Sequence, residues 1–175
     1  ISDGEMTSNG NVSVTVGANN APVAVNDTVA AVEDTAKTVT VMSLLANDTD
    51  ADMQTLTISE VGGATHGTVA LQGTNITFTP DPNYNGAASF TYRVSDGGSA
   101  STGTVMLTIA AVNDAPTVVD DTGFTGTEDA MLVLTAAQLL GNDSDVDGDT
   151  LRITAVGGPS HGTVTLPASA VGDTV

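Results

Sequence analysis

The sequence lacks cysteine and tryptophan, and it contains only two tyrosines and three phenylalanines. Without cysteine, the chain has no disulfide framework and no thiol chemistry. With so few aromatic residues, its cores have to be built from Val, Leu, Ile and Ala, so each domain is expected to be modestly stable alone. An extracellular domain without disulfides usually needs another source of stability, and bound metal is the obvious candidate.

Basic residues are also scarce, because three Lys and Arg residues stand against 21 acidic ones and the net charge is −18. This charge repels phosphate backbones and anionic lipid head groups, so it excludes nucleic acid as a partner and argues against direct membrane contact. No apolar run approaches the roughly 18 residues of a membrane span. The charge favours cations as partners, but a solvated, self-repelling surface would look the same, so residue spacing has to decide.

What the sequence does contain is an internal repeat of about 95 residues. The run Ala110–Pro116 echoes Gly17–Pro22, and the acidic segment Leu44–Asp52 recurs as Leu139–Asp147. The period is the size of one small sandwich domain. We therefore expect the tail of one repeat at 1–18, a complete repeat at 19–112, and the front of a third, truncated repeat at 113–175.

Short segments of alternating apolar and polar residues, separated by turn residues, fill the middle repeat. This period of two predicts β-strands, and the threonines on the opposite face suit a sheet surface that meets water. Helical signals are limited to two stretches that could each form one turn. The prediction is an all-β fold, a seven-stranded β-sandwich with strands near 24–32, 38–42, 55–61, 68–71, 75–79, 89–95 and 102–110.

The partial copies carry the same pattern. Val12, Val14 and Val16 alternate with polar residues, which predicts the last strand of a preceding repeat. The third copy follows the pattern to Leu166 but has no counterpart of residues 90–109, so two core strands are missing from it. Truncation of a longer protein is the simpler explanation. The alternative is a self-assembling extracellular filament, in which another chain completes the third repeat by strand exchange.

Both acidic segments place carboxylates at alternate positions, at Asp48, Asp50 and Asp52 and then at Asp143, Asp145, Asp147 and Asp149. In an extended chain, residues i and i+2 project to the same side about 6.6 Å apart, so their oxygens can converge on one hard cation. Calcium fits best, because it takes about 6 to 8 oxygen ligands in irregular geometry. Zinc has too few soft ligands here, since there is no cysteine and one histidine per repeat.

The segment Asp143–Gly148 matches the first half of an EF-hand loop. The match then fails, because Thr154 stands where the closing glutamate would be and Ser59 stands at the equivalent place in the middle repeat. The flanking segments also read as strands rather than helices. The spacing therefore indicates a different kind of calcium loop.

Five motifs occur in a fixed order, namely the joint motif ending in Ala21-Pro22, Val32-Glu33-Asp34, Asp50-x-Asp52, Val94-Ser95-Asp96-Gly97, and Val112-Asn113-Asp114-Ala115-Pro116. In this order they resemble the cadherin-like tandem repeat of giant bacterial surface adhesins, of the RTX-type or biofilm-associated kind. The resemblance covers the whole chain. It implies Greek-key β-sandwich repeats of the cadherin or immunoglobulin type, with calcium ions at the joints between repeats.

The resemblance also implies the calcium ligands. The joint after the middle repeat would use Glu33, Asn113, Asp114, Asp145 and Asp147, with Asp81 as a weaker addition. The joint before it would use Asn19 or Asn20 with Asp50, Asp52 and Asp96. Because Asn20 stands where the later joint has an aspartate, the earlier joint should bind fewer ions or bind them more weakly. Glu128 would serve a joint beyond the chain.

The function implied is that of a stalk or spacer, secreted or on the surface of a bacterial cell, in an adhesin or matrix protein. Calcium would neutralise the crowded carboxylates at each joint and stiffen it. The partners would be neighbouring repeats of the same long chain, and host or matrix glycans or proteins would be bound through other domains. The alternative from another class is a carbohydrate- or protein-recognition module with calcium bridging the ligand.

We do not expect an enzyme. His66 and His161 recur at the same place in two copies of a structural array, which favours a turn or packing role over catalysis. There is no nucleophile elbow and no phosphate-binding loop. Paired carboxylates could serve glycoside hydrolysis, but that chemistry needs aromatic platforms for sugar, and the few aromatic residues are spent on cores.

Overall fold

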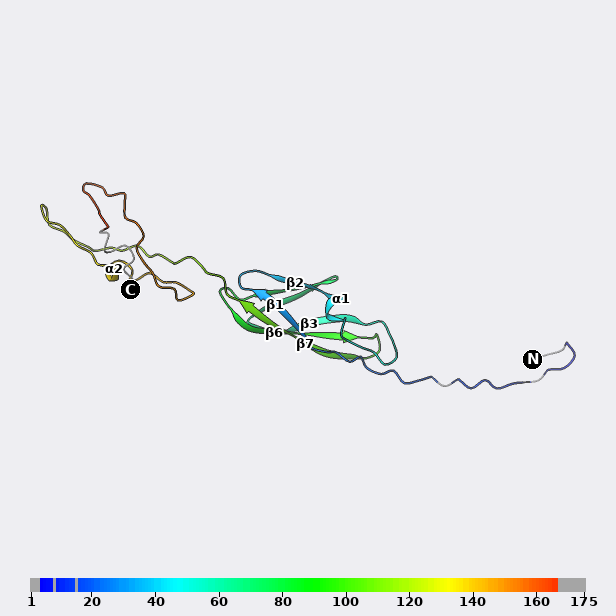
Figure 1. The fold of residues 1–175 in the computed structure, drawn as a ribbon. Helices are drawn as coiled ribbons and strands as arrows, with labels where there is room; N and C mark the ends of the chain where they lie inside the picture. The colour runs from blue at the N-terminus through cyan, green and yellow to red at the C-terminus, as the bar shows by residue number, and fades with distance from the viewer. Residues whose placement is uncertain (1–3, 8, 15, 167–175) are drawn as a thin grey trace. The chain divides into compact units, whose positions relative to one another are not determined.

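The structure is a computed structural model that describes residues 4–7, 9–14 and 16–166. The chain forms two compact units, Ile1–Ala111 and Val112–Val175. In Figure 1 the labelled strands all belong to the first unit, while helix α2 belongs to the second. The middle repeat is therefore the sheet-forming part of the described chain.

The first unit contains a two-layer β-sandwich. One sheet has four strands in the order β1-β7-β6-β3 and the other has three in the order β2-β5-β4, so the chain crosses repeatedly between the layers. This confirms the predicted all-β sandwich of seven strands. The elements are β1 (Asp27–Val32), β2 (Lys37–Thr40), α1 (Val41–Leu44), β3 (Thr57–Thr65), β4 (Gly67–Gln72), β5 (Asn75–Pro80), β6 (Gly86–Ser95) and β7 (Ala100–Ala110).

Strands β1 and β7 form the parallel pair of the sandwich, in register from Asp27 opposite Val105 to Val32 opposite Ala110. The named strands otherwise pair antiparallel. Because β1 and β7 run in the same direction, both end at the same edge of the domain. The residue after β1, Glu33, donates its backbone N–H to the carbonyl oxygen of Ala110 at 3.1 Å. This hydrogen bond holds the turn after β1 next to the end of β7, where the chain leaves the sandwich.

The core lies between the two sheets and follows the alternation read from the sequence. In β6 and β7 every second residue is buried, so the inward faces of these two central strands supply much of the apolar contact. Phe78 and Phe90 face each other with ring centroids 6.1 Å apart. The buried apolar residues are Ala31, Leu44, Ile58, Ile76, Phe78, Ala88, Phe90, Tyr92, Val94, Val105, Leu107 and Ile109.

Each unit also has one single-turn helix just before its acidic loop. In α1, the hydroxyl of Thr40 accepts a hydrogen bond from the backbone N–H of Ser43. In α2 (Ala136–Leu139), Thr135 caps the helix in the same way and Gln138 completes a capping box. The sequence predicted helical turns at 44–46 and at 136–140. The second lies at its predicted place, whereas the first begins three residues earlier, at Val41.

The second unit has no strand among its described residues, 112–166. Beside α2 it contains an isolated antiparallel bridge between Thr117 and Ser144, the counterpart of the bridge between Val23 and Thr49. Apolar side chains that a closed core would cover are exposed, such as Met131 at 88% and Val133 at 67%. The central strands of the middle repeat have no counterpart here, so the remaining segments have no sheet to pair with.

The strand predicted at residues 11–16 is not formed among its described residues, 11–14 and 16, while Thr15 lies outside them. Val12, Val14 and Val16 are exposed at 88%, 77% and 85%. An alternating segment becomes a strand only when a neighbouring strand accepts its hydrogen bonds. Among the described residues, no strand pairs with this segment. No helix in the described part of the chain is long and apolar enough to cross a bilayer.

Candidate metal centre

The acidic loop after α1 holds its carboxylates with backbone and side-chain donors. One oxygen of Asp50 (Oδ1) accepts the N–H groups of Asp52 at 2.8 Å and Gln54 at 3.3 Å. The backbone N–H of Asn20 donates to Oδ2 of Asp52 at 2.7 Å, and its side-chain amide lies 3.2 Å from both Asp52 oxygens. The linker before the middle repeat is therefore bound directly to the acidic loop.

Asp96 belongs to the same end of the first unit. The side-chain amide of Asn19 donates to Asp96 and to Ser99, each at 3.1 Å, and Gln54 donates to the amide oxygen of Asn19 at 2.7 Å. Backbone N–H groups of Gly98 and Ser99 bind the other Asp96 oxygen at 2.6 Å. Hydrogen bonding from the backbone of Ser99 above all, with Gly98 and Asn19 adding to it, lowers the pKa of Asp96.

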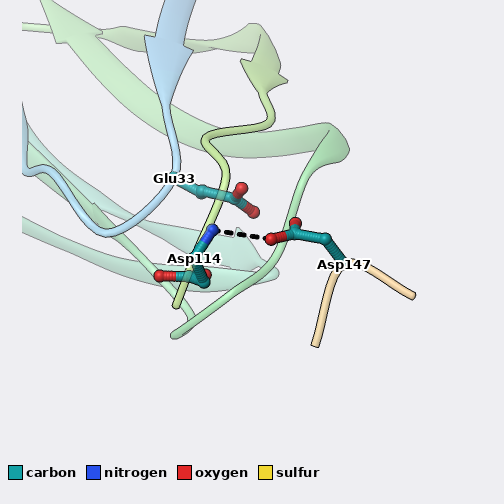
Figure 2. Close-up of side chains that lie close together, drawn as sticks. All are labelled: Glu33, Asp114 and Asp147. Atoms are coloured by element: carbon teal, nitrogen blue, oxygen red, sulfur yellow. Dashed lines mark hydrogen bonds between the residues drawn. The ribbon is translucent and has the colours of Figure 1, made fainter. Parts of the chain in front are cut away.

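The second unit builds the same loop. Oδ1 of Asp145 accepts the N–H groups of Asp147 at 3.0 Å and Asp149 at 3.2 Å. The N–H of Asp114 donates to Oδ2 of Asp147 at 2.7 Å, the dashed line in Figure 2. Asn113 turns its side-chain amide onto the carbonyl oxygen of Asp114 at 2.9 Å. Four sequence-predicted ligands, Asn113, Asp114, Asp145 and Asp147, are thus brought together within this unit.

In the described part of the chain, the first aspartate of each loop does not contact the linker. Oδ1 of Asp48 accepts the backbone N–H of Val25 at 2.7 Å, and Oδ1 of Asp143 accepts that of Val119 at 2.8 Å. Asp48 is only 8% exposed, so it faces into the sandwich rather than toward the linker. The alternate spacing suggested that all the loop carboxylates could converge on one cation. The first aspartate of each loop instead accepts a hydrogen bond from the segment that leads into the sandwich.

Glu33 lies at the opposite end of the middle repeat from its acidic loop, where β1 and β7 end. It is 1% exposed, and the side-chain amide of Asn85 donates to its Oε2 at 3.3 Å. Figure 2 labels Glu33, Asp114 and Asp147, the acidic residues that the resemblance to cadherin-like repeats assigns to one joint. A carboxylate buried to this degree is costly unless donors or cations compensate its charge.

The remaining predicted ligands are exposed. Asp81 starts the turn after β5, where its N–H binds the carbonyl of His66 at 3.1 Å. Glu128 lies in the turn between Thr127 and Ala130 of the second unit. Both stay predictions.

His66 sits at a backbone φ of 54° and its ring stacks on Tyr84, with the ring centroids 4.0 Å apart. His161 has nearly the same backbone conformation, with φ at 57°. A positive φ is a feature of turns, so both histidines have the backbone of turn residues.

The sequence analysis did not predict a buried polar cluster around the hydroxyl of Tyr92, because it treated Tyr92 as a core residue only. The Tyr92 hydroxyl lies 2.8 Å from the carbonyl of Val25, 2.9 Å from Asp27 and 3.3 Å from Asp48. Burial, and after it the charge of Asp48, raises the pKa of Asp27, while burial and the nearby carboxylates raise that of Tyr92. A tyrosine at a core position was the available signal, because a buried hydroxyl needs a partner.

A family model described as "Cadherin-like domain" matches residues 18–110 and, a second time, residues 112–170. The chain belongs to the cadherin-like domain family. Each match of this cadherin-like chain contains one acidic loop and its linker. The family assignment points to a non-enzymatic fold.

Among solved structures, the similarities to this cadherin-like chain are low. An endo-fucoidan hydrolase of glycoside hydrolase family 107 is 19% identical over 67% of this chain and 17% of its own, with a TM-score of 0.34. The titin domains z1z2, in complex with telethonin, are 11% identical over 59% of this chain and 55% of theirs, with a TM-score of 0.27. The chain spans less than a fifth of the hydrolase. No curated protein matches the sequence.

Proposed function

We propose that this chain is part of a calcium-stiffened repeat array that serves as a stalk or spacer in a secreted or surface-attached bacterial adhesin or matrix protein. Calcium is held at the joint after the middle repeat by Glu33, Asp114 and Asp147, with Asn113 and Asp145 as further ligands. Membership of the cadherin-like family supports this, because domains of this family typically bind Ca²⁺. The main binding partners of each repeat are the neighbouring repeats of the same long chain.

The acidic loop has the same geometry in both copies, and this observation supports the proposal most. In each copy a linker N–H donates to the third loop aspartate at 2.7 Å, from Asn20 to Asp52 and from Asp114 to Asp147. The contact holds loop carboxylates next to the linker. At the later joint the linker residue is itself an acid, so negative charge gathers where the chain enters the next repeat.

Glu33 adds a carboxylate from the preceding repeat. Its N–H is bound to Ala110, and Asp114 follows Ala110 by four residues, which span at most about 14 Å. We infer that Glu33, together with Asp114 and Asp147, would give three carboxylate ligands to one metal ion. Oxygen donors of this kind suit a hard cation such as calcium, and further carbonyl oxygens or water would fill its coordination shell.

The mechanism follows from charge. Two like charges about 4 Å apart repel by about 1 kcal/mol in bulk water and by about 4 kcal/mol near a protein surface. Without calcium, gathered carboxylates push the joint open; with calcium, they are neutralised and bound to one ion. Pro116, two residues after Asp114, helps because it fixes its own φ and biases its predecessor toward extended backbone.

Small-angle scattering of the whole chain in chelator and in millimolar calcium tests this function. The expected result is a larger maximum dimension and a narrower distance distribution with calcium. Glu33→Gln and Asp147→Asn should each remove the response, because each takes one charge from the proposed ligand set. Glu60→Gln is the matched control, since it removes an exposed charge from β3. Indistinguishable curves with and without calcium would rule out a calcium-stiffened joint.

A further inference from the structure

Glu33 is the most deeply buried acidic side chain among the described residues, at 1% exposed, and Asp48 follows it at 8%. An ionised carboxylate at such a depth is strongly destabilising unless its charge is compensated. Within the described part of the chain, neither oxygen of Glu33 belongs to the buried side-chain atoms that lack a hydrogen-bond partner. Donors of the protein itself therefore reach this carboxylate.

Asn85 supplies one of these donors, because its side-chain amide lies 3.3 Å from Oε2 of Glu33. Hydrogen bonds to an ionised acceptor are about twice as strong as neutral ones. An amide is also neutral, so it stabilises the ionised carboxylate without bringing a charge of its own. An acid at position 85 would remove the donor and add a second negative charge next to Glu33.

The loop between β5 and β6 holds Asn85 in place. The backbone N–H of Asn83 donates at 2.9 Å to Oδ1 of Asp34, the residue after Glu33. The ring of Tyr84, which precedes Asn85, stacks on the turn histidine with centroids 4.0 Å apart, and β6 begins directly after Asn85. The loop is thus bound to two successive residues of the turn after β1.

The contribution of the Asn85 amide depends on whether a cation is present. Without an ion, the amide offsets part of the cost of a buried negative charge. With a calcium ion on Glu33, the ion offsets the same charge, so the amide contributes less. Loss of the amide should consequently matter most when the calcium site is empty.

We propose that Asn85 compensates the charge of Glu33 when the calcium site is empty, so that the joint after the middle repeat can release its ion without unfolding that repeat. The compensation itself stands on contacts within the first unit. Its link to calcium rests on the proposed function. An amide at position 85 thereby lets calcium stiffen and leave the joint while the sandwich beside it stays folded.

Urea unfolding of the whole chain in chelator and in millimolar calcium, followed by tyrosine fluorescence, tests the inference. In chelator, Asn85→Ala should raise the equilibrium constant for unfolding of the first unit about 10- to 100-fold, because Glu33 loses a donor. Asn85→Asp should raise it further, because a like charge replaces that donor. In calcium, both increases should be much smaller, because the ion compensates Glu33.

A double-mutant cycle separates lost charge compensation from a general loosening of the loop. In a Glu33→Gln background there is no buried charge to compensate, so Asn85→Ala should raise the unfolding constant much less than it does in the wild type. Asn75→Ala is the matched control. It removes the amide of an exposed asparagine at the start of β5 and should change unfolding little in either condition.

Unchanged unfolding of Asn85→Ala in chelator would overturn the inference. Equal losses in the wild-type and Glu33→Gln backgrounds would also overturn it, because the loop rather than the charge would then be responsible. Losses that depend on Glu33 but are the same in chelator and in calcium would leave the compensation standing. They would contradict a calcium ion on Glu33, and the proposed function would fail instead.

Discussion

The complete middle repeat and the second unit share their loops but not their core. Each has a capped helical turn, an aspartate that binds the entering segment, an isolated bridge and a linker bound to the third loop aspartate. Even the unusual backbone recurs, with φ of 56° at Asp34 and 58° at Asp129. Only the first unit buries a sandwich core among the described residues. Loop geometry is thus encoded locally, while the sheets require strands from the whole repeat.

The largest expected difference between the units concerns the glycine after each turn histidine. A Cβ at Gly67 would collide with the carbonyl oxygen of Thr79 and the ring of Phe78, whereas a Cβ at Gly162 would meet nothing within 4 Å. Gly67→Ala should therefore destabilise the first unit by about 2–3 kcal/mol through overpacking. Gly162→Ala should have almost no effect.

Urea unfolding followed by tyrosine fluorescence measures this, because both tyrosines, Tyr84 and Tyr92, lie in the first unit. A Gly67→Ala variant that unfolds at the same urea midpoint as Gly162→Ala and the wild type would contradict the overpacking expected at Gly67.

Tyr92→Phe should have the next largest effect, because it removes a hydroxyl that the second unit lacks. The change leaves the Val25 carbonyl and the carboxylates of Asp27 and Asp48 without their shared donor. Loss of about 1–3 kcal/mol from the first unit is expected. Tyr84→Phe is the matched control, since its hydroxyl binds only the nearby carbonyl of Ala87 at 2.8 Å in a more exposed place. Equal losses for both variants would contradict a special role for the buried cluster.

The paired substitutions Asp48→Ala and Asp143→Ala compare the same contact in two environments. Asp48 is buried and Asp143 is half-buried, although each accepts one backbone N–H at nearly the same distance. We expect Asp48→Ala to cost about 1–2 kcal/mol, and Asp143→Ala less than about 0.5 kcal/mol, because water can replace an exposed partner. Hydrogen exchange of the Val25 and Val119 N–H groups gives the readout. A larger loss of protection at Val119 would reverse the comparison.

The smallest effect is a pH dependence of the first unit. The pKa of Asp27 is raised by burial and by Asp48, so protonated Asp27 favours the folded state. This contribution is present below the unfolded pKa of about 3.9 and is lost as pH rises through the folded pKa. The Asp27→Asn side chain stays neutral at every pH. The variant should therefore gain stability relative to the wild type as the pH rises through the folded pKa of Asp27. The free energies of unfolding of the two proteins are compared from pH 4 to pH 7. A difference between them that does not change with pH would contradict this prediction.

Much of the fold was predictable because buried and exposed residues alternate along its strands, and this alternation is visible in the sequence. The inward residues of β6 and β7 alternate without interruption, and the repeat showed which segments belong together. The strand predicted at residues 11–16 is not formed among its described residues, because a strand needs a neighbouring strand to accept its hydrogen bonds. The short helix of the second unit was predicted at its place, but that of the first begins three residues before the predicted stretch, because Thr40 caps it there.

The candidate site was predictable only in its residue types. Spacing indicated that the loop aspartates matter, but not that Asp48 turns inward to Val25 or that Asp52 binds the linker N–H. Those directions depend on which donors the folded loop presents. The partners of Tyr92 were equally hidden, because Val25, Asp27 and Asp48 meet its hydroxyl only once both sheets are assembled.

A calcium titration followed by NMR tests most directly whether one ion is shared across the joint. The backbone amide signals of Glu33, Asp114 and Asp147 in the whole chain should shift together and saturate at one calcium concentration. Glu33→Gln should then move the midpoint for Asp114 and Asp147 to higher calcium. Shifts confined to one unit, or a Glu33→Gln variant that titrates like the wild type, would contradict a calcium ion held jointly by the two repeats.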